Sequence, residues 1–377
     1  MHAQDIDYTP RVAVVHDYLT QRGGAERVVL SILKAFPEAD LYTSLFSPEE
    51  TFPEFRDLDV RTSWLNSVSL FRKNHRLALF LLPSAIESIK IDADLVVVSS
   101  SAFAHAVKTD APVLVYCHTP PRYLYLADEY LGRGIKAQLI KSMVSLVRPA
   151  LKFFDKKAAR RATKYLANST VVRSRIFDTY QIESDLVFPP TSLERSSDAK
   201  SLLLGRLAGT EGNFYILVSR LLPYKNVDKA IEAFRSRQDR SLIVVGSGPM
   251  FQQLNENLPE NVRLFSNISD SQLNWLYSNA KAIIAPSFED FGLTVIEAAA
   301  RGVPAIALRA GGYLDTVAEG ITGVFFDEPT QEQISLALEA FECADWNNDA
   351  IVEHADLFSE QKFISEMRRQ AEKLLYN

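Results

Sequence analysis

Two carboxylates, Glu289 and Glu297, stand eight residues apart in a segment that is patterned to bring them near a ligand. The apolar run at 282–285 predicts a buried strand, and the Ala-rich run at 293–301 predicts a helix. A strand, a loop and a helix in this order indicate a parallel sheet, which binds ligands at the carboxyl ends of its strands. Glu289 in the loop could accept hydrogen bonds from hydroxyl groups, and Glu297 could bind a diol. The spacing alone is equally compatible with structural roles, in which Glu289 caps the helix and Glu297 is a solvent-exposed helix residue.

Groups that suit a phosphate lie in the same half of the chain. Gly292 lets the backbone approach a ligand closely, and the helix start after it carries a partial positive charge. Arg220 and Lys225 follow another expected strand at 214–219, just before a helix that Asn226 can cap. Arg can grip a diphosphate as a fork and Lys as a point charge. The alternative is a pair of solvated surface cations.

Histidines and glycines follow strands in the first half of the chain. His118 comes directly after an expected strand at 113–117, and His16 follows the apolar run at 12–15. Gly23 and Gly24 then form the turn before an apolar-periodic helix. A lone histidine is more often structural and two glycines serve any tight turn, so the pattern alone gives these residues only candidate roles.

Composition sets limits on the class of protein. The 377 residues, 47% of them hydrophobic, exceed one ordinary core and predict two domains. A net charge of −6 argues against wholesale nucleic-acid binding. Cys117 and Cys343 both lie in apolar contexts, which predicts buried thiols in a reducing compartment. The polar N-terminus and the lack of long apolar runs predict a soluble, cytoplasmic protein that at most lies on a membrane.

Strand and helix patterns alternate twice along the chain, which predicts two doubly wound sheets. Composition shifts to polar residues after Pro189–Pro190, so the linker is expected there. We expect an N-terminal Rossmann-like domain at residues 1–200 and a second one at 201–358. An amphipathic helix at 359–377 is expected to return to the first domain.

Two competing classes of enzyme do not match the pattern. Gly246 and Gly248 follow a strand, but Phe251 stands where the dinucleotide fingerprint needs a third glycine, which argues against a hydride-transferring oxidoreductase. Asp92 and Asp94 could suggest a metal-dependent transferase, but they precede their strand and so lie at the end away from the chemistry. No cluster has metal-ligand spacing, so we expect no metal cofactor.

Two motifs resemble those of family 4 glycosyltransferases. One is Glu289-x7-Glu297 with Phe291-Gly292-Leu293 between the carboxylates, and the other is the run from Ser219-Arg220 to Lys225-Asn226. The resemblance implies a GT-B fold, in which two Rossmann-like domains face each other across a cleft. It also implies transfer of a sugar from a nucleotide donor, a co-substrate, with retention of anomeric configuration.

The resemblance assigns roles to the candidate residues. In the second domain, Glu297 would hold the ribose, and Arg220 and Lys225 the diphosphate. Glu289 with the backbone of Phe291, Gly292 and Leu293 would hold the transferring sugar, and Ser219 would be a further donor-binding residue. In the first domain, His118 would contact the donor sugar, while Gly23–Gly24 and His16 would lie near phosphate or acceptor. Glu289, His118, Arg220 and Lys225 would be the catalytic residues.

Motifs of the first domain narrow the substrates. The runs at 16–18, 23–26 and 118–125 resemble bacterial mannosyltransferases that build exopolysaccharide or O-antigen on a polyprenyl-diphosphate lipid. GDP-mannose is therefore the first choice of donor, with UDP-glucose and UDP-N-acetylglucosamine as alternatives. A nucleotide-sugar isomerase or hydrolase, and a non-catalytic partner subunit, also stay open.

A basic segment predicts contact with an anionic membrane surface. Residues 132–164 contain ten Lys and Arg but one acid, Asp155, and apolar residues interleave with the cations. A second candidate is the run at 70–82. Such segments can lie in the membrane interface. The alternative is that the apolar residues face the core and the cations are merely solvated.

Overall fold

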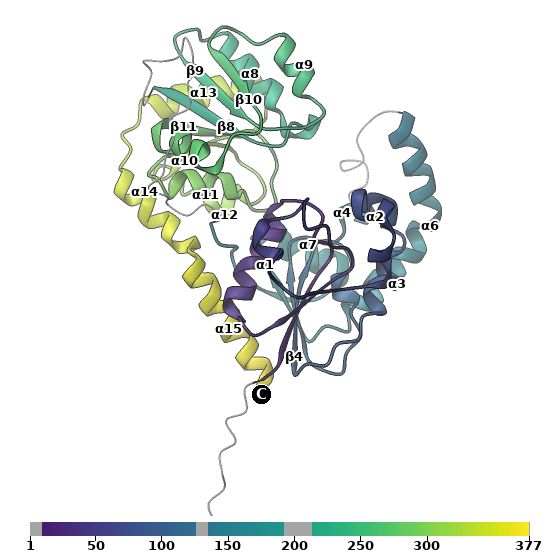
Figure 1. Ribbon diagram of the computed structural model, residues 1–377. Coiled ribbons are helices and arrows are strands. Elements are labelled where there is room, and N and C mark those ends of the chain that lie inside the picture. Colours follow the sequence, from purple (N-terminus) through teal and green to yellow (C-terminus); the bar gives the residue numbers. More distant parts are fainter. Residues whose placement is uncertain (1–9, 126–134, 192–212, 377) are drawn as a thin grey trace, which may run out of the picture. The chain divides into compact units, whose positions relative to one another are not determined.

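The computed structural model describes residues 10–125, 135–191 and 213–376, with the backbone alone at 76 and 135–146. The chain divides into two compact units (Figure 1). Unit 1 contains residues 1–190 and 360–377, and unit 2 contains residues 191–359. The boundary expected at residue 200 lies outside the described residues, and the division falls at Pro190 instead.

Unit 1 is built on a seven-stranded sheet in which every pair of neighbours is parallel. The strand order is β3-β2-β1-β4-β5-β6-β7, so the order reverses between β1 and β4. The strands are β1 (Val12–His16), β2 (Asp40–Thr43), β3 (Val60–Thr62), β4 (Leu95–Ser100), β5 (Val113–Cys117), β6 (Lys164–Ala167) and β7 (Ser184–Leu186).

Helices cover both faces of this sheet. The α-helices of unit 1 are α1 (Gly24–Ala35), α2 (Ser69–Lys73), α3 (Leu82–Glu87), α4 (Arg122–Tyr125), α6 (Ile135–Ala159), α7 (Thr170–Tyr180) and α15 (Glu360–Leu375). Short 3-10 turns are η1 (Pro53–Phe55), η2 (Trp64–Ser67), η3 (His75–Ala78) and η4 (Ala104–Ala106). The C-terminal helix α15 lies beside α1 (Figure 1).

Alternation along β1 separates the two cores of unit 1. Val14 packs in the cluster that contains Phe363 and Met367 of α15. Ala13 and Val15 pack in the opposite cluster, with residues of α6 and α7. Because successive side chains of a strand point to opposite faces, a strand covered on both sides is apolar throughout. This explains the continuous apolar runs that predicted the central strands.

Unit 2 repeats the same topology with a six-stranded parallel sheet in the order β10-β9-β8-β11-β12-β13. Its strands are β8 (Phe214–Val218), β9 (Ser241–Val245), β10 (Val262–Phe265), β11 (Ala280–Ala285), β12 (Ala305–Leu308) and β13 (Gly323–Phe326). Its helices are η6 (Pro223–Lys225), α8 (Val227–Arg235), α9 (Phe251–Glu256), α10 (Asp270–Asn279), α11 (Leu293–Ala299), α12 (Tyr313–Thr316), α13 (Gln331–Glu342), α14 (Asn348–Ala355) and η7 (Asp356–Phe358).

Three expectations about local structure were wrong in detail. The apolar run at 95–98 predicts a strand of that length, but β4 continues to Ser100, because its ladder with β5 continues through Ser99 and Ser100. The helix α11 ends at Ala299, two residues before Arg301. Cys117 is buried as expected, but Cys343 is exposed, because it lies at the end of α13. No helix in the described part of the chain combines the length and apolarity that a membrane crossing requires.

A buried carboxylate ties α6 to the rest of unit 1. Asp155 is fully buried, and its Oδ1 lies 3.0 Å from Nε2 of His105 in η4. The hydroxyl of Tyr125 in α4 donates to Asp155 Oδ2 at 2.7 Å. Burial and the Asp155 charge raise the pKa of Tyr125, so this hydroxyl stays a donor. Three segments distant in sequence therefore depend on one carboxylate.

We predict that Asp155→Ala destabilises the chain by about 3 kcal/mol, because it leaves the buried His105 ring and the half-buried Tyr125 hydroxyl without this partner. Asp178→Ala is the control, since Asp178 is exposed on α7 and should matter by less than about 0.5 kcal/mol. Urea denaturation followed by circular dichroism measures both. Equal midpoints for the two variants would contradict the anchoring role of Asp155.

Candidate functional site

Unit 2 gathers its candidate residues where the strand order reverses. β8 and β11 are neighbours, and β9 and β12 lie on their outer sides. Ligands of open parallel sheets bind beside the carboxyl ends of the strands at such a point. Ser219 and Arg220 follow β8, while Ser287, Glu289 and Gly292 follow β11. The sheet therefore brings together two segments whose named residues lie 67 to 73 positions apart in the sequence.

Lys225 and Glu289 form an ion pair at this point. The Lys225 ammonium contacts Glu289 Oε1, and Lys225 is only 5% exposed. Ser287 donates its hydroxyl to the same carboxylate oxygen at 2.7 Å, which fixes the carboxylate further. A buried charge is stable only when it is paired, so each member of the pair holds the other in place.

Asn226 positions Lys225 in a way that the sequence did not predict. Its backbone is left-handed, with φ 53°, and its side chain forms no cap hydrogen bond with α8. The amide instead donates to the carbonyl of Pro286 at 2.9 Å. Asn226 therefore joins the segment after β8 to the segment after β11, and the expected cap is wrong.

Arg220 and Ser219 differ in their surroundings. Arg220 is exposed, and its side chain forms no hydrogen bond or ion pair with residues that the structure describes. Ser219 donates its hydroxyl to the carbonyl of Arg220 at 3.2 Å and its N–H to Val245 at 3.0 Å. The Gly246–Gly248 loop supports this segment, because Leu221 N–H donates to the Ser247 carbonyl at 2.8 Å. Arg220 is thus a cation available to an anionic ligand.

Glu297 is a buried carboxylate, 7% exposed, one turn into α11, whereas Glu289 is partly exposed. It accepts a hydrogen bond from the Tyr277 hydroxyl at 3.1 Å. Burial, and next the Glu297 charge, raise the pKa of Tyr277 well above its usual value, so this hydroxyl remains a donor. Glu297 is therefore not the solvent-exposed helix residue that its spacing in the sequence also allowed.

The loop before α11 depends on Gly292. It begins α11 with a left-handed backbone, φ 93° and ψ 50°, and a Cβ there would lie 2.5 Å from the Tyr313 ring. Leu293 is the first residue of α11. The side chain of Phe291 is buried, with its ring centroid 5.7 Å from that of Phe358, so Phe291 can meet a ligand only through its backbone.

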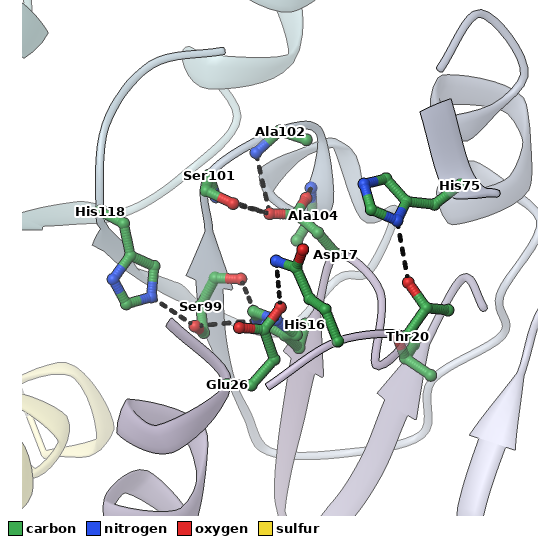
Figure 2. A network of polar contacts seen from close by, with 12 residues as sticks. His16, Asp17, Thr20, Glu26, His75, Ser99, Ser101, Ala102, Ala104 and His118 are labelled. Atoms are coloured by element: carbon green, nitrogen blue, oxygen red, sulfur yellow. Dashed lines mark hydrogen bonds and ion pairs between the residues drawn. The ribbon is translucent and has the colours of Figure 1, made fainter. Parts of the chain in front are cut away.

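Unit 1 has a second polar cluster, at the reversal between β1 and β4 (Figure 2). His16 ends β1, and His118 directly follows β5. Asp17 accepts hydrogen bonds from the N–H groups of Ser101, Ala102 and Ala104 at 2.5, 2.8 and 2.6 Å. Its carboxylate therefore holds the loop after β4 and has a structural role.

Ser99 connects the two histidines, and sequence reasoning missed it. Its hydroxyl lies 3.1 Å from His16 Nδ1 and 2.8 Å from His118 Nε2. Glu26 of α1 was missed too, although its carboxylate lies 3.9 Å from His16 Nε2. The signal for Ser99 was the polar run at 99–101 after an apolar strand, at the same sheet edge as His16 and His118.

Gly23 brings Glu26 close to the loop after β1. Gly23 precedes α1, and a Cβ there would lie 2.5 Å from Glu26 Oε2. Gly24 is the first residue of α1. A side chain at position 23 would therefore displace the carboxylate that faces His16.

The excluded pair Asp92 and Asp94 lies at the other end of β4, where both contact Arg11.

Comparisons with known proteins agree with this architecture. Residues 206–357 match the family described as glycosyl transferases group 1, and residues 22–190 match glycosyltransferase family 4. The chain belongs to glycosyltransferase family 4. Its two Rossmann-like units are those of the GT-B fold.

Relatives of this glycosyltransferase include mannosyltransferases. The human alpha-1,3/1,6-mannosyltransferase ALG2 is 25% identical over 376 residues, covering 88% of this chain and 87% of the human protein. A GDP-mannose-dependent alpha-mannosyltransferase of Corynebacterium glutamicum is 33% identical over 111 residues, 29% of this chain and 26% of that protein. The sucrose-phosphate synthase structure from Thermosynechococcus elongatus has a TM-score of 0.73 at 18% identity, covering 97% of this chain and 99% of that one.

We predict that Gly292→Ala lowers the stability of unit 2 more than Gly320→Ala does. Both glycines have positive φ, 93° and 75°, which costs a residue with a side chain about 1–2 kcal/mol. Only at Gly292 would the new Cβ also clash, since nothing lies within 4 Å of a Cβ at Gly320. Thermal unfolding measures the difference, and equal shifts would contradict the close packing of Tyr313 on this loop.

Proposed function

We propose that this glycosyltransferase transfers mannose from GDP-mannose, with retention of configuration, to a saccharide on a polyprenyl diphosphate during bacterial surface polysaccharide synthesis. The observation that carries the proposal is the Lys225–Glu289 pair beside Arg220, at the reversal of the unit 2 sheet. A cation for a diphosphate and a carboxylate for sugar hydroxyls are needed side by side wherever a sugar leaves a diphosphate.

Each candidate residue then has a physical task. Arg220 and Lys225 would stabilise the charge that develops on the leaving diphosphate, and losing one such group typically costs on the order of 10²–10³ in turnover. Glu289 would accept hydrogen bonds from the transferring sugar, and Glu297 from the ribose. His118 would contact the donor sugar. The leaving phosphate would take the acceptor proton from an oxocarbenium-like transition state, so positioning is the main contribution of the protein.

The choice of donor rests on two relatives whose names specify mannose. Structures of similar fold include a protein crystallised with UDP-glucose, at 18% identity and a TM-score of 0.64, which keeps UDP-sugars as the alternative. A panel of GDP-mannose, UDP-glucose and UDP-N-acetylglucosamine, tested for transfer to lipid extracts, separates them. The rate of transfer should be the same in the presence of EDTA, because diphosphate binding is assigned to Arg220 and Lys225 and no metal is required.

Two other functions make different predictions in the same assay. An isomerase or hydrolase would turn over the nucleotide sugar without any lipid acceptor. A non-catalytic subunit would turn over nothing, although it could bind a nucleotide. Transfer of labelled mannose that requires both GDP-mannose and the lipid extract supports the proposal, and turnover without acceptor would overturn it.

We predict that Glu289→Ala and Glu297→Ala fail in different ways. Glu289→Ala should lower turnover by about 10² or more while nucleotide diphosphate binding stays, because this carboxylate is assigned to the sugar. Glu297→Ala should weaken nucleotide binding by about tenfold or more, through lost hydrogen bonds to a charged group. Calorimetry measures nucleotide binding and transfer assays measure turnover. Glu332→Ala, at an exposed position of α13, is the control. Two variants that bind and turn over like the parent would remove the site assignment.

A lipid-linked acceptor requires the enzyme to work at the inner face of the cell membrane, and the surface around α6 supports such contact. Phe153 is 74% exposed on α6, and Leu70 and Leu77 are 57% and 52% exposed. A cavity of about 580 Å³ lies between α3 and α6, lined largely by apolar side chains such as Phe80, Leu151 and Phe154.

Cations accompany this surface, although several have structural partners. Arg148 donates to the Leu124 carbonyl at 2.6 Å, and Arg161 pairs with Glu87 at 2.8 Å. Burial, together with the charges of Arg148 and Lys156, lowers the pKa of Lys152. Lys156, Lys157 and Arg160 are exposed. Residues 132–134 of the basic segment lie outside the described residues.

We predict that the protein co-sediments with liposomes in proportion to their anionic lipid content and less at high salt. Replacing Lys156, Lys157 and Arg160 with Ser should weaken binding, because each cation adds about 1 kcal/mol near anionic lipid. Phe153→Ser should weaken it independently of salt. Lys229, Arg235 and Lys362, replaced together with Ser, remove the same charge elsewhere and serve as control. Binding that ignores lipid charge, or equal losses in both triple variants, would contradict the proposal.

A further inference from the structure

Four polar side chains form a continuous chain in unit 1 (Figure 2). They are Glu26 of α1, His16 of β1, Ser99 of β4 and His118 after β5. His16 and Glu26 are 1% exposed, Ser99 is fully buried, and His118 is 9% exposed. Four elements thus each contribute one group to a buried path that ends at His118.

The hydrogen positions on His16 follow from its neighbours. His16 Nδ1 lies 3.1 Å from both the carbonyl oxygen and the hydroxyl of Ser99. A carbonyl oxygen can only accept, so Nδ1 carries a hydrogen. Nε2 faces the Glu26 carboxylate at 3.9 Å, which favours a hydrogen there too. Both ring nitrogens are therefore donors, and His16 is a cation opposite an anion.

The balance of forces on His16 agrees with this assignment. Burial lowers the pKa of His16, but Glu26, Asp17 and the Ser99 carbonyl together raise it above its usual value. The groups that face the ring are Glu26 from α1, Asp17 at the end of β1, and Ser99 from β4. The neighbouring strand β2 contributes Thr43, which does not titrate in this range.

The state of His118 is then determined by Ser99. His16 Nδ1 carries a hydrogen and cannot accept from the Ser99 hydroxyl, so this fully buried hydroxyl donates its hydrogen to His118 Nε2 at 2.8 Å. A nitrogen that accepts a hydrogen bond carries no hydrogen. The hydrogen of a neutral His118 must therefore be on Nδ1.

We propose that Glu26, His16 and Ser99 are positioning residues that hold His118 as the neutral tautomer with its hydrogen on Nδ1. In this state His118 is a hydrogen-bond donor through Nδ1 and has no nitrogen to act as a base there. The use of that donor, toward an oxygen of the nucleotide sugar, rests on the proposed function. The tautomer itself follows from the contacts of Ser99 with His16 and His118.

The protonation state of His16, and with it the tautomer of His118, should change with pH in one direction. Because its neighbours raise the pKa of His16, His16 stays protonated to a higher pH than a free imidazole, and the doubly protonated ring that cannot accept from Ser99 persists until the pH rises through that pKa. Glu26→Gln removes the carboxylate that raises the His16 pKa. The loss of the His118 tautomer should therefore move to lower pH in this variant.

The direct experiment is a long-range ¹H–¹⁵N spectrum of the histidine rings in the full chain, which contains six histidines. His118→Gln assigns the His118 signals. The proposal predicts one protonated nitrogen on His118, identified as Nδ1 by its couplings, in the protein without substrate. A His118 ring with its hydrogen on Nε2, or on both nitrogens at neutral pH, would overturn it.

Two serines of β4 provide matched variants. Ser99→Ala should remove the preference of His118 for Nδ1–H and leave His105 unchanged. Ser100→Ala is the control, because Ser100 is equally buried but lies 3.1 Å from His105 Nδ1. If Ser99→Ala fails to fold, the parent spectrum shows which His118 nitrogen carries the hydrogen, and Glu26→Gln shows whether this changes at lower pH. A His118 spectrum that Ser99→Ala leaves unchanged counts against the proposal.

Kinetics separate this inference from the proposed function. With the donor that the panel identifies, Ser99→Ala should lower kcat about tenfold and leave KM for the nucleotide sugar nearly unchanged, as expected for one lost hydrogen bond in the transition state. Ser99→Thr keeps the hydroxyl and should restore most of kcat. If the spectra agree but no donor is turned over, the proposed function fails and the tautomer stands. If transfer occurs and Ser99→Ala matches the parent in kcat and spectrum, the positioning role fails alone.

Discussion

The contact between the buried Lys225 and the partly exposed Glu289 is the interaction on which the candidate site of unit 2 depends. It joins the segment after β8 to the segment after β11, and the Asn226 amide adds a second link between the same segments. An unpaired ammonium at this depth would be costly, so the pair keeps both groups in position until a ligand replaces one of the contacts. A diphosphate would replace Glu289 as the partner of Lys225 and leave the carboxylate for the sugar.

The same topological constraint organises both units. In each parallel sheet the order reverses between two central strands, and the polar residues lie at the carboxyl ends of these strands. In unit 2 those residues are charged and suit a diphosphate. In unit 1 they form a buried polar chain from Glu26 and His16 through Ser99 to His118. Sheet order therefore determines where the two clusters form, and side-chain chemistry determines what each can bind.

Much of this arrangement could be predicted from the sequence, since buried parallel strands are continuous apolar runs. The strand at 113–117 matches its predicted bounds, because both faces of the sheet are covered by helices. The pairing of Glu289 with Lys225 could not be predicted, because it depends on β8 and β11 being neighbours. Ser99 was missed for a similar reason: its role arises from its place between β1 and β5 and not from a motif.

Binding of a diphosphate by Arg220 and Lys225 is tested most directly by calorimetry of the parent, Arg220→Met and Lys225→Met. The ligands are the nucleoside diphosphate of the preferred donor and the corresponding monophosphate. Arg220→Met breaks no contact among the described residues, so its effect reports on the ligand alone. The account predicts that each variant loses about tenfold or more in affinity for the diphosphate and less for the monophosphate. Unchanged diphosphate affinity in both variants would contradict it.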